Sequence, residues 1–407
     1  MKTSTNDLAD RQILVAGTGP AGMIAALAFS AAGFDVVLVG PPVRTDDRRT
    51  TALMAPALSF LESLGIGDEL ADKSAPLKAM RIVDGTSRLV RGPVVTFRAD
   101  EIGEAAFGYN IPNAHLNAVL EQHVTAASRI AWVRAMVDDW HLGADAANAA
   151  LSDGTTISVP LVVAADGRGS PARRAAGIAT ADRPHRQSAF VTVFAHSRDH
   201  HDISTEFHTE SGPFTQVPLP GRRSSLVWVV RPEEGERLGA LDAARLSRTI
   251  EDRMQSMLGK IEVDGSPQLY PLSASLPHRF AANRVVLTGE AAHLFPPIGA
   301  QGLNLGIRDV SEAVRVAGLH RGDPGAPAAL DAYDRARRPD ILARTAAVEL
   351  LNRSLLSDFL PTQLVRSAGL AVLGRSSPLR GFFMREGLRA GSGFRSVFAD
   401  LREKVGR

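Results

Sequence analysis

The chain has 407 residues, of which 44% are hydrophobic and 22% are charged, and its formal net charge is +2. This is the composition of a globular protein that is long enough for two packed domains and an appendage. Cysteine is absent, which excludes disulfides, thiol nucleophiles, iron–sulfur clusters and a cysteinyl link to a flavin.

The N-terminal region predicts a buried strand–helix–strand unit and no membrane span. Residues 1–7 are polar and lack the layout of a secretory signal. Residues 13–40 are apolar, but glycines and Asp35 interrupt them, which favours two short strands around a helix. We therefore expect a cytoplasmic protein without a transmembrane helix.

The first of these strands, residues 13–16, is followed by a G-x-G-x-x-G turn and an Ala-rich helix to about residue 32. In this context the glycines permit a tight turn that brings a helix N-terminus against a pyrophosphate. The residues of this turn that we assign to a dinucleotide are Gly17, Gly19, Pro20, Ala21 and Gly22.

The next strand, residues 35–39, ends in Gly40, where such folds usually carry an acid that binds the adenosine ribose. A neutral residue with Arg44 nearby would suit an NADP-type site. Alternatively, Asp46 or Asp47 would take the place of the acid from the following loop. The local sequence leaves both interpretations open.

The middle of the chain alternates between helical and strand-like patterns. A helix is predicted at 52–64, short strands at 78–103, a helix from Asn113 to about 124, and strands at 130–163 with a hairpin turn at Asp153-Gly154. Residues 187–231 form the clearest β-rich block, a helix follows at 242–258, and the sequence from 339 to the end is helical in character.

Two further strands end in residues suited to a ligand. The strand at 161–165 leads into Asp166-Gly167, and the strand at 284–287 leads into the run 288–309, which carries Glu290 and then Gly299-Ala300-Gln301-Gly302. The glycines let backbone approach a flat ligand, and the helix opening at Gly302 and Leu303 would point its positive end at a reduced flavin.

Together, these three motifs resemble the flavin-dependent aromatic hydroxylases, the class of para-hydroxybenzoate hydroxylase, and within it the ubiquinone-biosynthesis hydroxylase family. The resemblance covers about residues 10–345. The chain departs from the family signature at Pro296, where the family has His, at Ala300, where it has Gly, and at Glu290, where it has Asp.

The resemblance implies an α/β fold, in which a mixed β-sheet substrate domain is inserted into a Rossmann-like FAD-binding domain and helices follow. The FAD-binding domain would comprise residues 1–78, 104–182 and 276–345. The substrate domain would comprise 79–103 and 183–275, and 346–407 would form a C-terminal helical segment.

The resemblance also implies noncovalent FAD, and it matches further residues to cofactor contacts. Arg49 would neutralise pyrophosphate charge, Asp166 would shape the pyrophosphate and ribityl environment, and Glu290 would accept hydrogen bonds from ribityl hydroxyls. For Arg49 a solvated position, and for Asn113 a plain helix cap, remain alternatives. The remaining cofactor-binding residues are Asn113, Gly289, Pro297, Gly299, Gln301, Gly302, Leu303 and Asn304.

No catalytic side chain and no metal site stand out, and His293 is read as a structural histidine. In this class NADPH or NADH binds transiently and reduces the flavin, which then passes one oxygen atom of O2 to an electron-rich ring. The expected substrate is a polyprenylated phenol of ubiquinone assembly. Another aromatic small molecule, an NADP-only reductase, a peroxide-forming flavin reductase and a noncatalytic flavin-binding subunit are the alternatives.

The charge of the chain is uneven. Residues 351–407 hold ten Lys and Arg against four Asp and Glu, a local charge of +6, which leaves −4 for the rest. A slightly acidic body is not expected to bind nucleic acid. The basic, partly apolar tail would dock on the inner membrane face or on a biosynthetic complex, or it would pack on its own domain.

Overall fold

The computed structural model describes residues 11–43, 47–86, 91–294, 302–356, 368–369 and 371–388. Its main sheet has six strands, and every neighbouring pair is parallel except β18 with β19. The central strands are apolar runs buried on both faces, as expected for a parallel sheet that helices cover. In spatial order the strands are β18 (Ala281–Ala282), β19 (Val285–Leu287), β12 (Leu161–Ala164), β1 (Ile13–Ala16), β2 (Val36–Val39) and β8 (Ile130–Val133).

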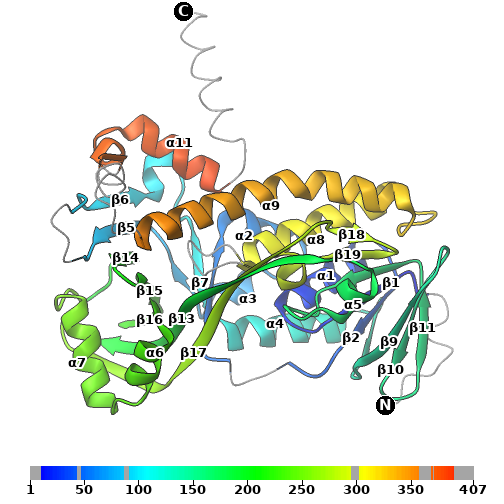
Figure 1. Cartoon of the computed structure of the whole chain (residues 1–407), viewed down its shortest axis with the longest axis horizontal. Coiled ribbons are helices and arrows are strands. Elements are labelled where there is room, and N and C mark those ends of the chain that lie inside the picture. The colour runs from blue at the N-terminus through cyan, green and yellow to red at the C-terminus, as the bar shows by residue number, and fades with distance from the viewer. Residues whose placement is uncertain are drawn as a thin grey trace, which may run out of the picture.

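A second, mixed sheet forms the other part of the molecule (Figure 1). Two of its strands come from the early segment that precedes residue 103, and β5 joins β14 in parallel. The order is β17 (Ile261–Pro277), β13 (Thr180–His196), β16 (Arg223–Val230), β15 (Gly212–Leu219), β14 (Ile203–Thr209), β5 (Ala79–Asp84) and β6 (Val95–Arg98). The predicted insertion of a β-rich unit into the cofactor fold is confirmed.

The long strands β13 and β17 join the two parts. Each has 17 residues, and they pair antiparallel from the second sheet to a point beside the first (Figure 1). The second sheet has its own core, in which Phe190, Phe214 and Trp228 make edge-to-face contacts. Helices α6 (Pro232–Gly239) and α7 (Ala243–Arg253) pack against β17.

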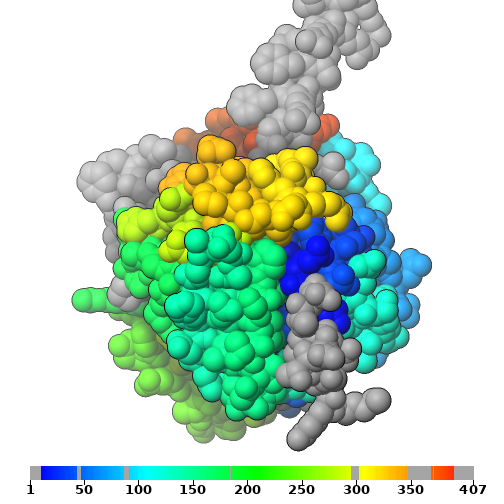
Figure 2. All heavy atoms as spheres, turned by 90° about the vertical axis from the view of Figure 1, so that its right-hand side faces the viewer, coloured from blue at the N-terminus to red at the C-terminus, as the bar shows by residue number. Residues whose placement is uncertain are grey.

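The remaining strands form two small sheets of three strands each. One consists of β9 (Val137–Leu142), β10 (Ala147–Leu151) and β11 (Thr156–Val159), and the predicted turn at Asp153-Gly154 joins its last two strands. Figure 2 shows this sheet covering one end of the molecule, below residues of α8 and α9. The other consists of β3 (Thr50–Met54), β7 (Gly108–Pro112) and β4 (Ala75–Pro76).

The prediction of a helix at 52–64 is wrong for its first residues, because residues 50–54 form β3 and the helix α2 begins at Ala55. Pairing with β7 holds these residues extended, and the side chain of Asn304 adds hydrogen bonds to their backbone. Both partners are distant in sequence.

The remaining helices surround the two large sheets. They are α1 (Pro20–Ala31), α2 (Ala55–Ser63), α3 (Gly67–Ala71), α4 (Asn113–Ala126), α5 (Pro171–Ala175), α8 (Gly302–Leu319), α9 (Pro327–Leu356) and α11 (Ser377–Leu388), with short 3₁₀ turns η2 (Ala99–Ile102) and η3 (Gly289–Ala291). In the described part of the chain, none of the helices is both long enough and apolar enough to cross a bilayer.

Candidate functional site

The three sequence motifs meet at one edge of the six-stranded sheet. Strands β1, β12 and β19 are parallel neighbours, so Gly17, Asp166 and Gly289 follow their carboxyl ends side by side. Backbone hydrogen bonds join these ends, from Ala165 N to Ala16 O at 2.8 Å and from Thr288 N to Ala164 O at 2.9 Å. Ligands of open α/β sheets bind in this position.

The glycine turn is packed too closely for a side chain at two of its three glycines. Gly17 has φ +111°, and a Cβ there would lie 2.3 Å from the carbonyl oxygen of Ala165. A Cβ at Gly22 would lie 1.9 Å from the carbonyl oxygen of Gly17, whereas a Cβ at Gly19 would meet nothing within 4 Å. The turn is therefore packed on its inner side and open at Gly19, where α1 begins.

The N-terminus of α1 offers its amides to an anion. Pro20 occupies the first turn, no side chain caps the helix, and its first turn holds no acidic residue. Unsatisfied N–H groups and the positive end of the helix dipole bind phosphate well. The residues present therefore fit the pyrophosphate of a dinucleotide.

Gly40 is required by packing. A Cβ at this position would come within 2.8 Å of Cγ2 and 2.9 Å of Oγ1 of Thr18. The carbonyl of Gly40 also accepts a hydrogen bond from Nε1 of Trp132 at 3.1 Å. An acid at position 40 would therefore require the Thr18 side chain, which donates to Pro41 O, to move.

Asp166 holds a buried carboxyl group with one unused oxygen. Its Oδ2 accepts from the amide of Ala172 at 3.1 Å, while Oδ1 is buried with no partner among the described residues. Burial raises the pKa of Asp166 above its ordinary value, against the effect of the hydrogen bond from Ser170. A buried oxygen without a donor is costly, and a hydroxyl of a bound cofactor would satisfy it.

Arg173 ties the loop after β12 to the loop after β19. Its guanidinium donates to the carbonyl oxygens of Ala291 and Arg168, each at 2.8 Å. Arg173 makes no direct hydrogen bond to Asp166 among the contacts of the described residues, but its charge partly offsets the rise that burial causes in the pKa of Asp166. Arg173 therefore positions both cofactor loops.

Glu290 lies in η3 and pairs with Arg168 across these two loops. The distance from Nε of Arg168 to Oε2 of Glu290 is 3.1 Å, and the side chains are 43% and 49% exposed. The carboxylate is thus held at the sheet edge while half of it remains accessible to a ligand.

Arg49 and Asn113 lie in one polar cluster around Asp47. Arg49 forms a two-pronged ion pair with Asp47, at 2.9 and 2.7 Å, and stacks 5.4 Å from the ring centre of Tyr270. Asn113 donates to Asp47 at 3.0 Å and accepts from Thr51 at 2.6 Å. Burial opposes ionisation of Asp47, but hydrogen bonds from Arg49 and Asn113 leave its pKa below the ordinary value.

The contacts in this cluster bear on two alternatives, a solvated Arg49 and Asn113 as a plain helix cap. Arg49 is anchored and not freely solvated, although 43% of its side chain is exposed to a ligand. Asn113 is the first residue of α4 and does not cap it, since the cap position is Pro112 and carries no side-chain hydrogen bond.

The N-terminal part of α8 is fixed against β3 by Asn304. Its Nδ2 donates to Ala52 O at 2.7 Å, and its Oδ1 accepts from Met54 N at 2.8 Å. Gly302 and Leu303 begin the helix, as predicted. Pro297, Gly299 and Gln301, which were also assigned to the cofactor, lie outside the described residues.

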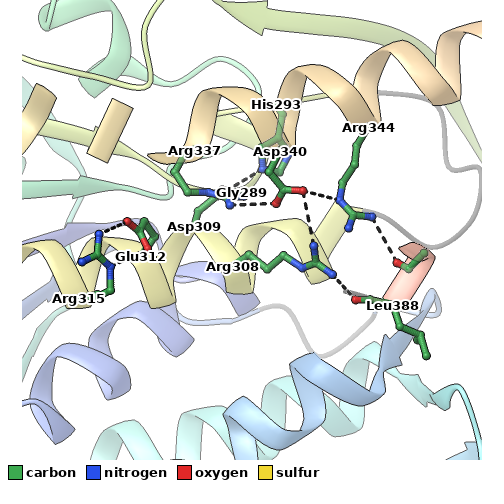
Figure 3. A network of polar contacts seen from close by, with 11 residues as sticks. Gly289, His293, Arg308, Asp309, Glu312, Arg315, Arg337, Asp340, Arg344 and Leu388 are labelled. Carbon is green, nitrogen blue, oxygen red and sulfur yellow. Dashed lines mark hydrogen bonds and ion pairs between the residues drawn. The ribbon is translucent and has the colours of Figure 1, made fainter. Parts of the chain in front are cut away.

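Asp309 organises a buried ion-pair network behind the site, which Figure 3 shows. Its Oδ2 accepts from the amide of Gly289 at 3.1 Å and lies 2.7 Å from Nε2 of His293, while Oδ1 accepts from Nε of Arg337 at 2.8 Å. Arg337 also pairs with Asp340 at 3.0 Å. His293 and Asp309 are buried, so this histidine is part of the scaffold of the Gly289 loop.

Sequence reasoning assigned no role to Asp309 or Arg337. Asp309 ends the run that resembles the family signature, which was an available signal. Arg337 had no local signal, because its position beside Asp309 depends on the packing of α9 against α8.

The sheet-edge geometry is that of a dinucleotide-binding enzyme, and comparison with known proteins defines the class. Residues 10–347 match the family model described as an FAD binding domain. The fold is also that of p-nitrophenol 4-monooxygenase from Pseudomonas putida DLL-E4, with a TM-score of 0.75 and 19% identity, over 93% of this chain and 98% of that one. The chain thus has a FAD-binding domain over most of its length and the fold of a flavoprotein monooxygenase.

Two curated relatives define the family more closely. The ubiquinone hydroxylase UbiL of Rhodospirillum rubrum is 34% identical, over 95% of this chain and 90% of that protein. The 3-demethoxyubiquinol 3-hydroxylase of Escherichia coli is 26% identical, over 91% and 96%. The chain belongs to the ubiquinone-biosynthesis hydroxylase family of FAD-dependent enzymes.

Replacing Glu290 by Ala is expected to weaken FAD binding about 10- to 150-fold, because a hydrogen bond to a charged group contributes about 1.5–3 kcal/mol. Fluorescence titration of the apoprotein with FAD measures the change. Arg168→Ala is the matched control, since it removes the ion-pair partner of Glu290 and keeps the carboxylate. Equal FAD affinity in Glu290→Ala and the wild type would show that Glu290 does not contact the cofactor.

Proposed function

We propose that the protein hydroxylates the aromatic ring of a polyprenylated phenol in ubiquinone biosynthesis, with O2 as the oxygen source and NADPH or NADH as the electron donor. The observation that carries the proposal is the similarity to the Rhodospirillum rubrum ubiquinone hydroxylase over nearly the whole length of both chains. The sheet-edge site supports it, because its glycine turn and the unused oxygen of Asp166 suit FAD.

The groups of this chain would bind and orient the cofactor. The α1 amides and Arg49 would hold the pyrophosphate, and Asp166 and Glu290 would accept hydrogen bonds from ribityl hydroxyls. Bound FAD would supply the transfer of two electrons from NAD(P)H and the activation of O2. One oxygen atom would enter a ring C–H bond to give C–OH, and the other would leave as water.

The second sheet would hold the ring and keep water away. Its strand β16 faces β3 through the contact between Ser225 Oγ and Thr50 Oγ1, at 2.9 Å, and Asn110 donates to Pro218 O at 2.9 Å. These contacts fix the substrate sheet against β7, which leads into Asn113, and against β3, to which Asn304 is hydrogen-bonded. Rigid placement of a ring beside the cofactor accounts for much of the rate of such reactions.

Deletion of the gene tests the proposal in the cell. Loss of the enzyme should lower ubiquinone and lead to accumulation of a prenylated precursor that lacks one ring oxygen, which quinone profiling by mass spectrometry would detect. Restoring the gene should reverse both changes. A normal ubiquinone level with no accumulated precursor would contradict the proposal.

We further propose that the C-terminal segment brings the enzyme to an inner membrane face or to a biosynthetic complex. In the described part, Val372 and Phe383 are 53% and 52% exposed, while Met384 packs on the body of the protein. Residues 357–367 and 389–407, which hold much of the predicted surface, lie outside the described residues.

Co-sedimentation with anionic vesicles tests this docking. The full chain should sediment with the vesicles and be released by salt, because each Lys or Arg near the surface contributes at most about 1 kcal/mol. A chain that ends after residue 388, and so keeps α11, should bind less. Equal and negligible sedimentation of both forms would remove the membrane from the proposal.

A further inference from the structure

An apolar cavity of about 260 Å³ lies beneath α11. One wall is the N-terminal half of α8, with Asn304, Leu305 and Arg308, and the roof is α11, with Phe383 and Met384. Residues of α2, β5 and β6 close the remaining sides. The cavity therefore lies where the cofactor domain, the substrate sheet and the C-terminal helix meet.

Two arginines line this apolar space, but their charged groups have polar partners. Arg308 and Arg344 both pair with Asp340, at 3.6 and 2.8 Å, and both donate to carbonyl oxygens at the end of α11 (Figure 3). Arginine stems commonly cover apolar surface while their heads reach polar partners. The two guanidinium groups thus hold the roof, and their stems contribute hydrocarbon to the wall.

The cavity begins close to the predicted flavin-facing end of α8. The lining residues of α8 run from Asn304 to Arg308, so this wall begins about 3 Å from the first residue of the helix and is about 6 Å long. At α11 the cavity reaches the surface, because the lining residue Phe383 is 52% exposed while its neighbour Met384 is 6% exposed. A hydrocarbon chain could run from the helix start to an apolar rim.

We infer that this cavity binds the first isoprene units of the polyprenyl tail of the substrate, an inference that rests on the proposed function. An apolar cavity of about 150 Å³ takes up benzene. At the same packing, this cavity would hold about ten carbon atoms, or about two isoprene units. Further units would pass Phe383 and leave the protein beside α11.

The test is the binding of phenols with zero to four isoprene units to the FAD-loaded enzyme, measured by calorimetry at a fixed detergent concentration. Each of the first two units should raise affinity about 10- to 100-fold, as burial of several methylene groups implies. Later units should change affinity at most about twofold. A steady gain over all four units, or no gain, would overturn the inference, because neither outcome requires a cavity of limited length.

Gly387→Leu adds an apolar side chain at the roof of the cavity. Gly387 lines the cavity, and a Cβ there would meet nothing within 4 Å, so the variant should fold. The ratio of affinities for the two-unit and unprenylated phenols should fall at least tenfold. The matched control is Gly318→Leu, which lies on the exposed end of α8 with equally open space and should keep the wild-type ratio. A wild-type ratio in Gly387→Leu would contradict the inference.

Met80→Ala enlarges the cavity from the β5 side and should extend the gain to a third unit. Product formation in the same samples separates the two proposals. If the ring is hydroxylated but the affinity gain does not stop after the second isoprene unit, the cavity assignment is wrong and the proposed function stands. Absence of hydroxylation with every phenol would overturn the proposed function.

Discussion

Asp309→Ala should destabilise the protein by about 3–5 kcal/mol and release the cofactor, because it breaks the buried ion pair with Arg337. Asp309 is fully buried, and its carboxylate joins Arg337, His293 and the amide of Gly289. The loss therefore affects the packing of α9 and the loop that carries Glu290. Urea unfolding followed by circular dichroism, with FAD release followed by fluorescence, measures both effects.

The matched control for this variant is Asp331→Ala. Asp331 also pairs with an arginine, Arg279, but the two side chains are 49% and 52% exposed. Exposed pairs contribute at most about 1 kcal/mol, so this variant should unfold close to the wild type and keep FAD. Similar losses in both variants would show that the buried network has no special role.

Gly22→Ala should weaken FAD binding. The added Cβ would lie 1.9 Å from the carbonyl oxygen of Gly17, so the glycine turn must open. Overpacking of this kind costs about 1–3 kcal/mol, and affinity should fall by about 5- to 150-fold if the bound state bears the whole cost. Titration of the apoprotein with FAD measures the fall.

The control for Gly22 is a glycine in a helix with free space. Gly318 in α8 has no atom within 4 Å of an added Cβ, so Gly318→Ala should keep the wild-type affinity. If Gly22→Ala also kept it, the tight turn would not be needed to hold the pyrophosphate.

The sequence predicted the fold and the three turns that meet at one edge of the main sheet, since these signals were local. Turns at Gly17, Asp166 and Gly289 follow buried strands, and parallel strands bring such turns to one edge. The β-rich block was likewise visible from its alternation, and its place in a sheet with β5 followed from the resemblance.

The sequence could not predict contacts that depend on distant segments. Residues 52–54 were predicted as helix because local periodicity cannot reveal pairing with β7 or the amide of Asn304. The anchoring of Arg49 by Asp47 and Tyr270 and the linkage of Asp309 to Arg337 have the same origin. The cavity below α11 likewise depends on how segments that are distant in sequence pack together.

The central claim, that the chain is a FAD-dependent ring hydroxylase, is tested most directly with isotopically labelled O2. The FAD-loaded protein is incubated with labelled O2, NADPH or NADH, and a prenylated phenol, and the mass of the product is measured by mass spectrometry. The account predicts one labelled oxygen atom in the ring for each NAD(P)H oxidised. Oxidation of NAD(P)H that yields only labelled hydrogen peroxide, with the phenol unchanged, would contradict it.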